Sequence, residues 1–316
     1  MSLGLLDIDT VRFQFDGQLD DAARRRFDHG KWAQTTRDEP GNEWTGKILP
    51  DLVVREYLTR GQVVVSGSPH KVALGESVGP FGPAEFAGWV NRFAVRLGVD
   101  PDDVRAARVS RFDVAANLDV AAPAAEYVAI AEPPMRMRAV GSGATTVTFR
   151  NTRAQVTLYD KVQKILDRKR AHALPPSWEG KNVLRVEARF LKPRREFGRD
   201  VTVGMLCDPA FWAEVADRYE ERALAVALRR GSRAVPAPES VPELVDAYAA
   251  IGIQASGGTD VAIARINGAV RRKDIQRHQG NRQRKKIREL ASHQAGDADL
   301  ADEFASRVAE AAASVR

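Results

Sequence analysis

The sequence predicts an α+β fold, in which a central antiparallel β-sheet carries helices on one face and a small all-helical C-terminal domain follows. Three observations predict it. Segments 109–120, 154–159 and 183–191 alternate between apolar and polar residues with the period of two that a β-strand requires. Between such strands, apolar residues recur at helical spacing, as Phe86, Trp89 and Phe93 do. After residue 230 the strand patterns end and helical patterns replace them.

The first third of the chain predicts two strand units. Residues 8–15 alternate, with Val11 and Phe13 on one side and Arg12 on the other. We expect a short polar helix over 20–29 and a loop over 31–45, which is rich in turn formers. Residues 52–58 and 62–65 predict a β-hairpin closed by Gly61. A loop with a short helical turn follows, and Pro83 opens a helix.

The middle third continues the alternation of strands and helices. A helix is predicted over 123–131, a turn at 141–143, and a pair of strands over 145–149 and 154–159. A charged helix from 160 to about 173 precedes the strand 183–191. Asp208 and Pro209 are typical of a helix N-cap and first helical position, so a helix is expected from there to about 230. No internal repeat is visible in the sequence.

These elements predict three regions: a strand-and-helix domain over 1–230, a proline-containing linker over 231–242, and a helical basic domain over 243–316. From 265 to 288 the chain has ten Lys or Arg residues and a single acid, Asp274. Such a run suits a polyanionic partner, although it is also typical of a solvated helix face. The basic residues predicted to contact DNA here are Arg271, Arg272, Lys273, Arg284, Lys285 and Lys286.

The composition narrows the function classes. Lys and Arg number 48 against 42 Asp and Glu, the net charge is +6 and the pI is about 9.5, which favours a nucleic-acid partner. Cys207 stands alone, so an internal disulfide and a cysteine-based zinc site are excluded. No apolar run is long enough to span a bilayer and no signal peptide is visible, so we expect a cytoplasmic protein without a membrane partner. Motifs for ATP binding or serine hydrolysis are missing from the sequence.

If the three alternating strands share one sheet, their polar residues gather on one face. Carboxylates on that face suit a hard divalent cation, Mg²⁺ or Mn²⁺, and its basic residues suit phosphates. Tyr159 could then attack a phosphate and keep a covalent phosphotyrosine, with Lys161 helping to stabilise the phenolate. Alternatively, Tyr159 is an ordinary strand tyrosine and the charged residues form cross-strand ion pairs. The polar face comprises Asp113, Asn117, Asp119, Tyr159, Lys161, Arg185, Glu187 and Arg189.

Four blocks in this order resemble a known family: 66–72 with Gly75 shortly after, 109–113, 157–161 and 184–189. From about residue 5 to 225 the chain resembles the rolling-circle replication initiators of filamentous phages (the gene II/gene X group), which are related to the Rep_trans-type plasmid initiators. In one departure, Glu76 and Ser77 follow Gly75 where the family has Gly-x-Asn. Residues 231–316 have no counterpart in the resemblance, so their role rests on charge.

The resemblance implies a site-specific nickase-ligase. It would cut one strand of a double-stranded origin, stay on the 5′ phosphate through tyrosine and leave a 3′ hydroxyl. Asp113 and Glu187 match the metal-binding acids of the family, and Tyr159 matches its tyrosine. Lys161 and Arg185 match the basic residues beside those positions.

Beyond the resemblance, we expect Arg111 to position Asp113, and Lys71, Arg153, Arg185 and Arg189 to contact DNA. Asn117 and Asp119 lie further along the strand, roughly 13 and 20 Å from Asp113 at about 3.3 Å per residue, and are not expected to share its metal. The expected partners are a double-stranded origin and a host helicase and polymerase. Two alternatives stay open: a non-catalytic origin-binding or copy-control protein, and a metal-dependent nuclease that uses water and forms no covalent adduct.

Overall fold

The computed structural model describes residues 3–20, 22–23, 33–39, 42–49, 51–75, 78–167, 174–228, 249, 258–272 and 276–316. Side chains of 33–39, 42–49, 258–261, 277 and 288–299 are not part of that description. Most of the predicted helix 20–29 and all of the predicted linker 231–242 lie outside the described residues. No helix in these ranges is long and apolar enough to cross a membrane.

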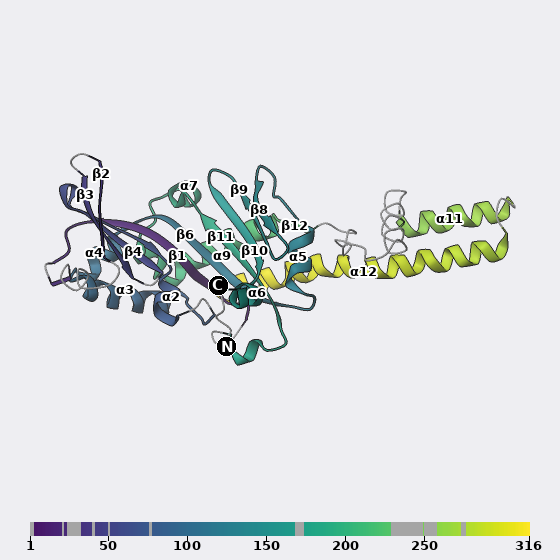
Figure 1. The fold of residues 1–316 in the computed structure, drawn as a ribbon, viewed down its shortest axis with the longest axis horizontal. Coiled ribbons are helices and arrows are strands. Elements are labelled where there is room, and N and C mark those ends of the chain that lie inside the picture. Colours follow the sequence, from purple (N-terminus) through teal and green to yellow (C-terminus); the bar gives the residue numbers. More distant parts are fainter. Residues whose placement is uncertain are drawn as a thin grey trace.

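An antiparallel β-sheet runs through the molecule, as the sequence predicts (Figure 1). Among the described residues it has ten strands in the order β2-β3-β4-β5-β1-β6-β11-β10-β9-β8, while β7 (Ala131–Glu132) pairs separately with β12 (Ala227–Leu228). The strands of the large sheet are β1 (Leu6–Asp16), β2 (Ala33–Glu39), β3 (Asn42–Leu49), β4 (Leu52–Tyr57), β5 (Gln62–Gly67), β6 (Arg108–Val120), β8 (Arg138–Gly143), β9 (Thr146–Arg150), β10 (Ala154–Asp160) and β11 (Asn182–Phe190).

The three strands that carry the predicted site are neighbours in this sheet, in the order β6-β11-β10. Their register places Arg189 opposite both Asp113 and Gln155, and Arg185 opposite both Asn117 and Tyr159. Side chains directly opposite each other lie on the same face of a sheet. The predicted separation of an apolar face from a polar face is therefore confirmed for all three strands.

The sheet repeats one connectivity twice. From one edge inward the order is β2-β3-β4-β5-β1, and from the other edge it is β8-β9-β10-β11-β6. In each half, the strand that comes first in the chain lies at the centre, and the following strands return towards it from the edge. The two central strands, β1 and β6, pair antiparallel. The fold thus contains an internal duplication that the sequence does not reveal.

Two predictions about loops are wrong. Residues 31–45, expected to be a loop, contribute β2 and much of β3, which extend the sheet beyond β4. The predicted turn at 141–143 belongs to the edge strand β8, whose six residues are all exposed. β8 lies at one edge of the sheet with its side chains exposed, so the alternation that marks a half-buried strand is missing there, and β2 forms the opposite edge.

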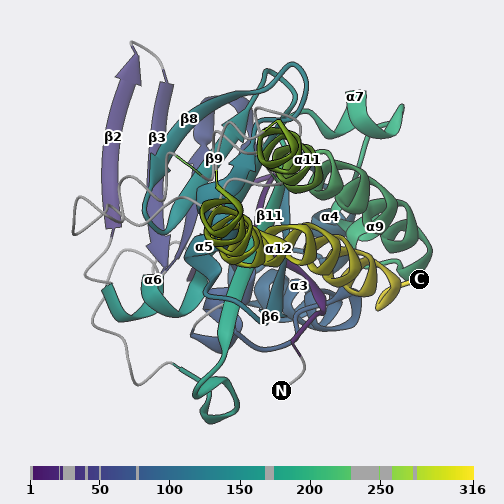
Figure 2. The ribbon, with the colours of Figure 1, turned by 90° about the vertical axis from the view of Figure 1, so that its right-hand side faces the viewer.

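Helices cover the apolar face of the sheet, and Figure 2 shows α3, α4 and α9 together on one side of it. Phe86, Trp89 and Phe93 of α3 are buried as predicted, and Trp212 of α9 is completely enclosed. The helices are η1 (Leu58–Arg60), α2 (Pro69–Leu74), α3 (Pro83–Leu97), α4 (Pro101–Ala106), α5 (Ala124–Ile130), α6 (Lys161–Asp167), η3 (Pro176–Trp178), α7 (Pro193–Phe197), α8 (Val203–Leu206), α9 (Pro209–Leu224), α11 (Gly258–Arg271) and α12 (Arg277–Ala313).

The opposite, polar face is covered at one end. Val183 shares this face with Arg185 because the two are separated by one residue on β11. It packs against Ile165 of α6 and Trp178 of η3 in a small apolar cluster. The expectation of helices on one face therefore holds for most of the sheet but not for this end, where α6 crosses to the polar side.

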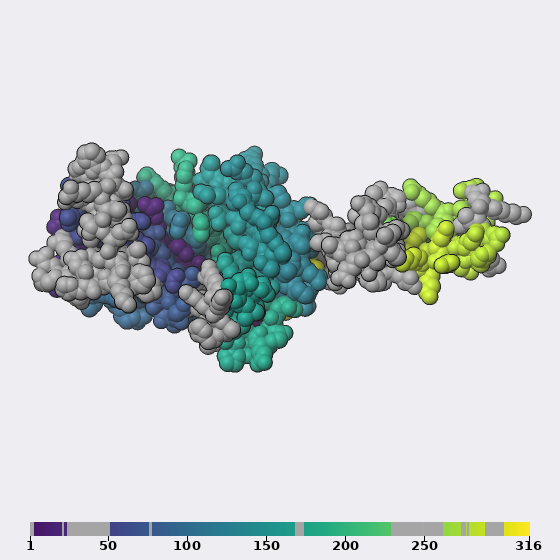
Figure 3. Space-filling view, in the orientation of Figure 1, coloured from purple at the N-terminus to yellow at the C-terminus, as the bar shows by residue number. Residues whose placement is uncertain are grey.

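The C-terminal helix α12 spans 37 residues, about 55 Å at 1.5 Å per residue. One end pairs with α11 in an arm that extends away from the sheet (Figures 1 and 3). The other end packs into the main core through Leu300, Phe304 and Val308. Its Glu303 accepts hydrogen bonds from the Ala121 amide, at 2.9 Å, and from a tyrosine hydroxyl on α5. The helical region 243–316 was predicted as a separate domain, but its last turns belong to the core of the sheet body.

Candidate active site

Tyr159 lies on the polar face of β10, where the alternation of the strand places it. Its hydroxyl donates a hydrogen bond to Glu187 Oε1 on the neighbouring strand at 2.6 Å. The side chain is 3% exposed. Burial raises the pKa of Tyr159 well above its usual value, the charge of Glu187 raises it further, and the Arg185 guanidinium opposes both. The predicted nucleophile therefore has a proton acceptor in direct contact and is protonated at rest.

A lysine covers the ring of Tyr159. The Lys164 ammonium lies 3.5 Å from the ring centroid, which is the geometry of a cation–π interaction. Helix α6 starts directly after β10, so it folds back over the tyrosine near the end of the strand. Lys161, predicted to assist the phenolate, is buried at the start of the same helix, and the residue over the ring is one that the sequence pattern did not single out.

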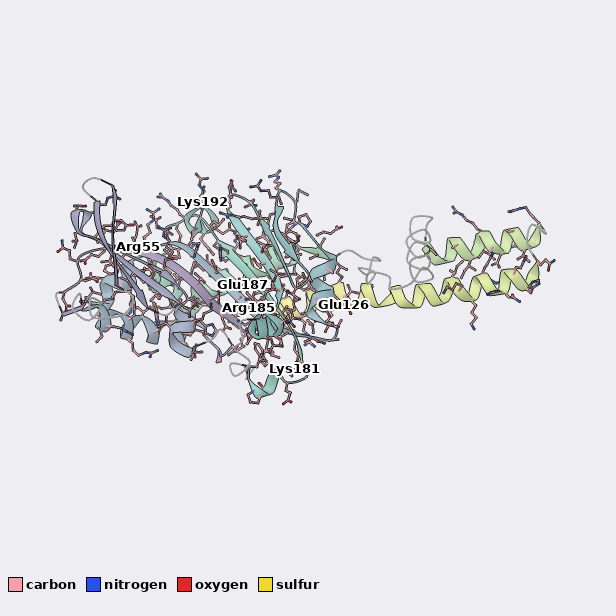
Figure 4. All side chains as sticks on the ribbon, in the orientation of Figure 1. Arg55, Glu126, Lys181, Arg185, Glu187 and Lys192 are labelled. Atoms are coloured by element: carbon pink, nitrogen blue, oxygen red, sulfur yellow. The ribbon has the colours of Figure 1, made fainter. Side chains whose placement is uncertain are left out.

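Arg185 joins three oxygen acceptors beside this tyrosine. It is completely buried and donates to Glu187 Oε1 at 3.0 Å, to Asn117 Oδ1 at 3.0 Å and to Asp9 Oδ1 at 2.8 Å. Figure 4 shows Arg185 and Glu187 next to each other in the middle of the sheet. That Arg185 contacts DNA stays a prediction, and in this structure its donors are directed at protein groups. Its guanidinium is surrounded by protein acceptors and holds the site together from within.

Asp9 enters this network because β1 is irregular. The pairing of β1 with β6 shifts by one residue between Ile8 and Thr10, which is the pattern of a β-bulge. Neighbouring strand residues normally point to opposite faces, so in a regular strand Asp7 and Thr10, three residues apart, would point to opposite faces. The shift places both on the polar face, and Asp9 lies between them. The sequence pattern assigned no role to Asp9, since alternation does not show a bulge.

Asp113 forms a second ion pair on β6. Its Oδ2 accepts from Arg189 at 2.7 Å, and Arg111 lies 3.9 Å from Oδ1, so Arg111 is next to Asp113 as predicted. Burial raises the pKa of Asp113 to about 7, while Arg189 and Arg111 act in the opposite direction. The buried Asp113 Oδ1 has no hydrogen-bond partner in the described structure.

The predicted metal ligands, Asp113 and Glu187, lie on neighbouring strands and on the same face. Glu187 is directly opposite Ala115, so the two carboxylates are diagonal neighbours, about 7–8 Å apart at the Cα atoms. Among the described residues no three His, Cys, Asp or Glu side chains come together as a metal site. Mg²⁺ is often held by one or two carboxylates with water and substrate phosphates, so this pair and the unpartnered Asp113 oxygen fit such an ion. Whether it binds stays a prediction.

A buried histidine and a buried aspartate complete the surroundings of Arg185. His70 of α2 stacks on Phe81, with ring centroids 5.0 Å apart, and burial lowers its pKa to about 3. Asp7 accepts a hydrogen bond from the Phe81 amide at 2.8 Å, and burial raises its pKa to about 7. The nearby Arg185 lowers the pKa of both groups, so all three belong to one electrostatic unit.

The other residues predicted to contact DNA are spread over the molecule. Lys71 of α2 lies 3.6 Å from Asp51 in an ion pair, and Arg153 is exposed in the turn between β9 and β10. In the arm, Arg284 donates to Asn267 Oδ1 at 2.7 Å and so joins α12 to α11. Lys273 lies outside the described residues. The remaining predicted cations of the arm, Arg271, Arg272, Lys285 and Lys286, have exposed side chains.

The duplication gives Tyr159 a counterpart in the first half of the sheet. Tyr57 on β4 lies opposite Gln62 on β5, just as Tyr159 on β10 lies opposite Arg185 on β11. The position two residues further along the partner strand is Val64 in the first half and Glu187 in the second. Tyr57 therefore has the same place in the fold without the acid.

Comparison with known proteins identifies a family that part of this chain matches. Residues 45–201 match the family model Phage_CRI, which describes the N-terminal part of the replication-associated gene II protein, and the matched segment contains Tyr159, Glu187 and Asp113. A search of curated protein sequences found no match. Among solved structures, the chain is similar to Methanococcus jannaschii TBP at 11% identity and a TM-score of 0.29, over 61% of this chain and 94% of that one. That score is too low to establish a shared fold.

The family match shows the class of protein: the chain is a phage DNA-replication protein. It belongs to the family of replication-associated gene II proteins of filamentous phages. The resemblance predicted from four sequence blocks is confirmed over the matched residues.

Proposed function

We propose that this protein starts rolling-circle DNA replication by nicking one strand of a double-stranded origin through Tyr159, and later rejoins the strand. One observation carries the proposal: the Tyr159 hydroxyl donates directly to Glu187, at 2.6 Å, on the polar face of the sheet. A tyrosine with an adjacent base is the arrangement that activates a hydroxyl nucleophile. Membership of a replication-associated family supports DNA as the substrate.

In the proposed reaction, the Tyr159 oxygen attacks the scissile phosphorus while its proton passes to Glu187. The bond between phosphorus and the 3′ oxygen breaks, so the phosphate stays on tyrosine as a 5′-phosphotyrosine. The 3′ oxygen takes up a proton and becomes the primer end. Attack of a 3′ hydroxyl on the phosphotyrosine reverses these steps and rejoins the strand, because the covalent link retains the energy of the broken bond.

Cations around the tyrosine support this chemistry. Arg185 and Lys164 lie beside the phenol and stabilise the negative charge that develops when its proton leaves. Because Tyr159 is buried, the incoming strand must displace Lys164 from the ring, which brings its ammonium next to the phosphate. A divalent cation, Mg²⁺ or Mn²⁺, held by Asp113 and Glu187 would act as a Lewis acid on the phosphate oxygens.

The wider proposal concerns partners and location. We assign origin binding partly to the basic arm, where Arg271, Arg272, Lys285 and Lys286 are exposed. Host helicase and polymerase are the expected next participants, since a nicked origin with a free 3′ end needs both unwinding and synthesis. The corresponding place of action is the cytoplasm of the bacterial host.

The test is covalent trapping on DNA. Supercoiled plasmid carrying the cognate origin is incubated with the protein and Mg²⁺ or Mn²⁺, and the protein is then denatured. We expect nicked plasmid with protein attached to its 5′ end, and loss of both in Tyr159→Phe. Tyr57→Phe is the matched control, since it removes the same hydroxyl from the equivalent position, and we expect it to nick normally.

Other outcomes favour the alternatives. Nicking that persists in Tyr159→Phe would assign cleavage to water and make the protein a metal-dependent nuclease. Origin binding without any nicking would make it a non-catalytic replication or copy-control protein. Nicking that survives EDTA would contradict the role of the divalent cation.

A further inference from the structure

A row of polar side chains, three of them arginines, crosses the polar face away from Tyr159. Arg138 on β8 lies opposite Arg150 on β9, Arg150 opposite Gln155 on β10, and Gln155 opposite Arg189 on β11. Directly opposed residues share a face, so the row lies on the same side of the sheet as Tyr159. From Arg138 to Arg189 it spans three strand spacings, about 14 Å.

The outer end of this row borders a cavity of about 710 Å³. Its lining has no acidic residue, and three of its members are arginines. None of these three arginines forms an ion pair with any residue that the structure describes. The lining residues are Arg136, Met137, Arg138, Val140, Arg150, Asn151 and Thr152.

Two features of this cavity are energetically unfavourable in the protein without a ligand. Like charges directly opposite each other in neighbouring strands repel, and Arg138 and Arg150 are such a pair. Arg136 has a backbone φ of +65°, in a turn closed by the Met137 amide and the Pro134 carbonyl. Glycine or asparagine is favoured at a turn position with positive φ. Unfavourable backbone and charge at one place point to a ligand that compensates them.

We propose that this cavity binds the phosphate backbone of the DNA strand that leads away from Tyr159. An arginine fork matches a phosphate with two parallel hydrogen bonds, and three forks around one cavity suit adjacent phosphates. The exposed side chains of Met135 and Val140 give the same edge an apolar surface for sugars or bases. This inference rests on the proposed function, because it takes Tyr159 as the point where the strand is held.

The distance suits a strand held at two points. Gln155 lies four residues from Tyr159 on β10, about 13 Å, and Arg138 and Arg150 lie one or two strands to the side. The separation between tyrosine and cavity is therefore about 14–16 Å. A strand in B-form geometry advances about 3.4 Å per nucleotide, so the cavity would hold phosphates about four or five nucleotides from the nick.

The experiment measures DNA binding without cleavage. The full-length protein is titrated into a fluorescein-labelled 20-nucleotide single strand in EDTA, and anisotropy gives the affinity at several salt concentrations. For the double variant Arg138→Gln/Arg150→Gln we expect about tenfold weaker binding, in the range for a lost charged hydrogen bond. The slope of log K against log salt should become less negative by about 1.4, since each phosphate contact to a single strand contributes about 0.7.

Controls separate this site from general charge and from misfolding. Arg92→Gln/Arg96→Gln removes two exposed arginines from α3, in the helical layer, and should change affinity less than twofold. Arg138→Lys/Arg150→Lys keeps the charge, so it should restore the salt slope but only part of the affinity. Circular dichroism melting confirms that each variant is folded.

The outcomes are distinct. A folded Arg138→Gln/Arg150→Gln variant with the affinity and salt slope of the α3 control would overturn the proposal. So would unchanged strand binding together with lost binding of a labelled mononucleotide, because the cavity would then be a nucleotide site. A wild-type protein with no affinity for DNA would contradict the proposed function itself, whereas a failure of nicking would leave this binding test valid.

Discussion

The two halves of the sheet have the same connectivity and different chemistry. Each has a tyrosine at the same place, Tyr57 on β4 and Tyr159 on β10, with a basic residue over the ring: Arg60 at 5.9 Å and Lys164 at 3.5 Å. The partner strands differ, because β5 presents Gln62 and Val64 where β11 presents Arg185 and Glu187.

This difference teaches that the fold supplies a scaffold twice, while a charged pair on one strand makes one copy into a candidate site. Tyrosine alone is therefore a poor signal of function in this chain. Substitutions at the features that distinguish the second half, and at the strained edge of its polar face, test this difference.

The largest effect is expected from Glu187→Gln, which gives the second half a neutral side chain at the position of Val64. Without a proton acceptor, the nicking rate should fall about 10²–10⁴-fold, the usual contribution of a general base. DNA affinity should stay within about threefold of the wild type. Nicking assays on supercoiled origin plasmid and anisotropy binding check the two parts, and a variant that nicks at the wild-type rate would remove Glu187 from the mechanism.

The next effect is on stability. Arg185→Met leaves Asp9, Glu187 and Asn117 without their shared donor, so the free energy of unfolding should fall by about 3–5 kcal/mol, as when one partner of a buried ion pair is removed. The same change at its counterpart, Gln62→Met, should cost less than about 0.5 kcal/mol. Urea denaturation measures both. Equal losses would mean that the network is no more stabilising than the first half.

Buried Asp7 on β1 makes the stability of the protein depend on pH. The pKa of Asp7 is about 7 in the folded state, against an ordinary value of 3.8, so the folded state binds the extra proton between these values. Stability from Asp7 is thus complete below about pH 4 and is lost as pH rises through about 7. Relative to wild type, Asp7→Asn should gain up to about 4 kcal/mol from pH 4 to 8, at about 1.36 kcal/mol per pKa unit.

The measurement is urea denaturation of wild type and variant across this pH range. Only their difference isolates Asp7, because Asp113 acts in the same direction and His70, with its lowered pKa, acts in the opposite one. Asp16→Asn, which removes an exposed carboxyl from the same strand, is the control for the change in formal charge. A variant curve parallel to that of the wild type would show that Asp7 is ionised in the folded protein.

The smallest expected effect is at the exposed edge. Arg136→Gly should raise the free energy of unfolding by about 1 kcal/mol, because glycine adopts a positive φ without strain. The same variant should bind single-stranded DNA more weakly, so stability and binding change in opposite directions. Thermal unfolding and anisotropy test this pair of effects, and a loss of stability would mean that the Arg136 side chain supports the turn.

Much of the fold can be predicted from local sequence patterns, but the hydrogen-bond network around Arg185 and Tyr159 cannot. Alternation in 109–120, 154–159 and 183–191 predicts strands and assigns their faces, because only one face is apolar. It does not show which strand pairs with which, so Tyr159 and Glu187 could be placed on one face but not in contact. Asp9 enters through a bulge, and Lys164 through the start of a helix. Both depend on backbone geometry that a periodic pattern does not contain.

Other misses have a visible signal or a clear physical reason. The sequence places Arg185 among the cations of the polar face, but it does not show that its hydrogen-bond acceptors come from three different strands. The docking of α12 could have been found, since Leu300, Phe304 and Val308 recur every four residues and make an apolar stripe. The duplication gives no visible repeat in the sequence, because what the two halves share is mainly the connectivity of their strands.

The docking of α12 also bears on how the chain is made. The sheet body obtains Leu300, Phe304 and Val308 only after the arm has been synthesised, because these residues follow α11 and the basic part of α12 in the chain. A polypeptide that stops short of them lacks part of the main core and exposes the apolar surface that α12 covers. Every translated chain with a complete core therefore also carries the arm. The sheet body and its basic arm should be present in equal numbers in the cell.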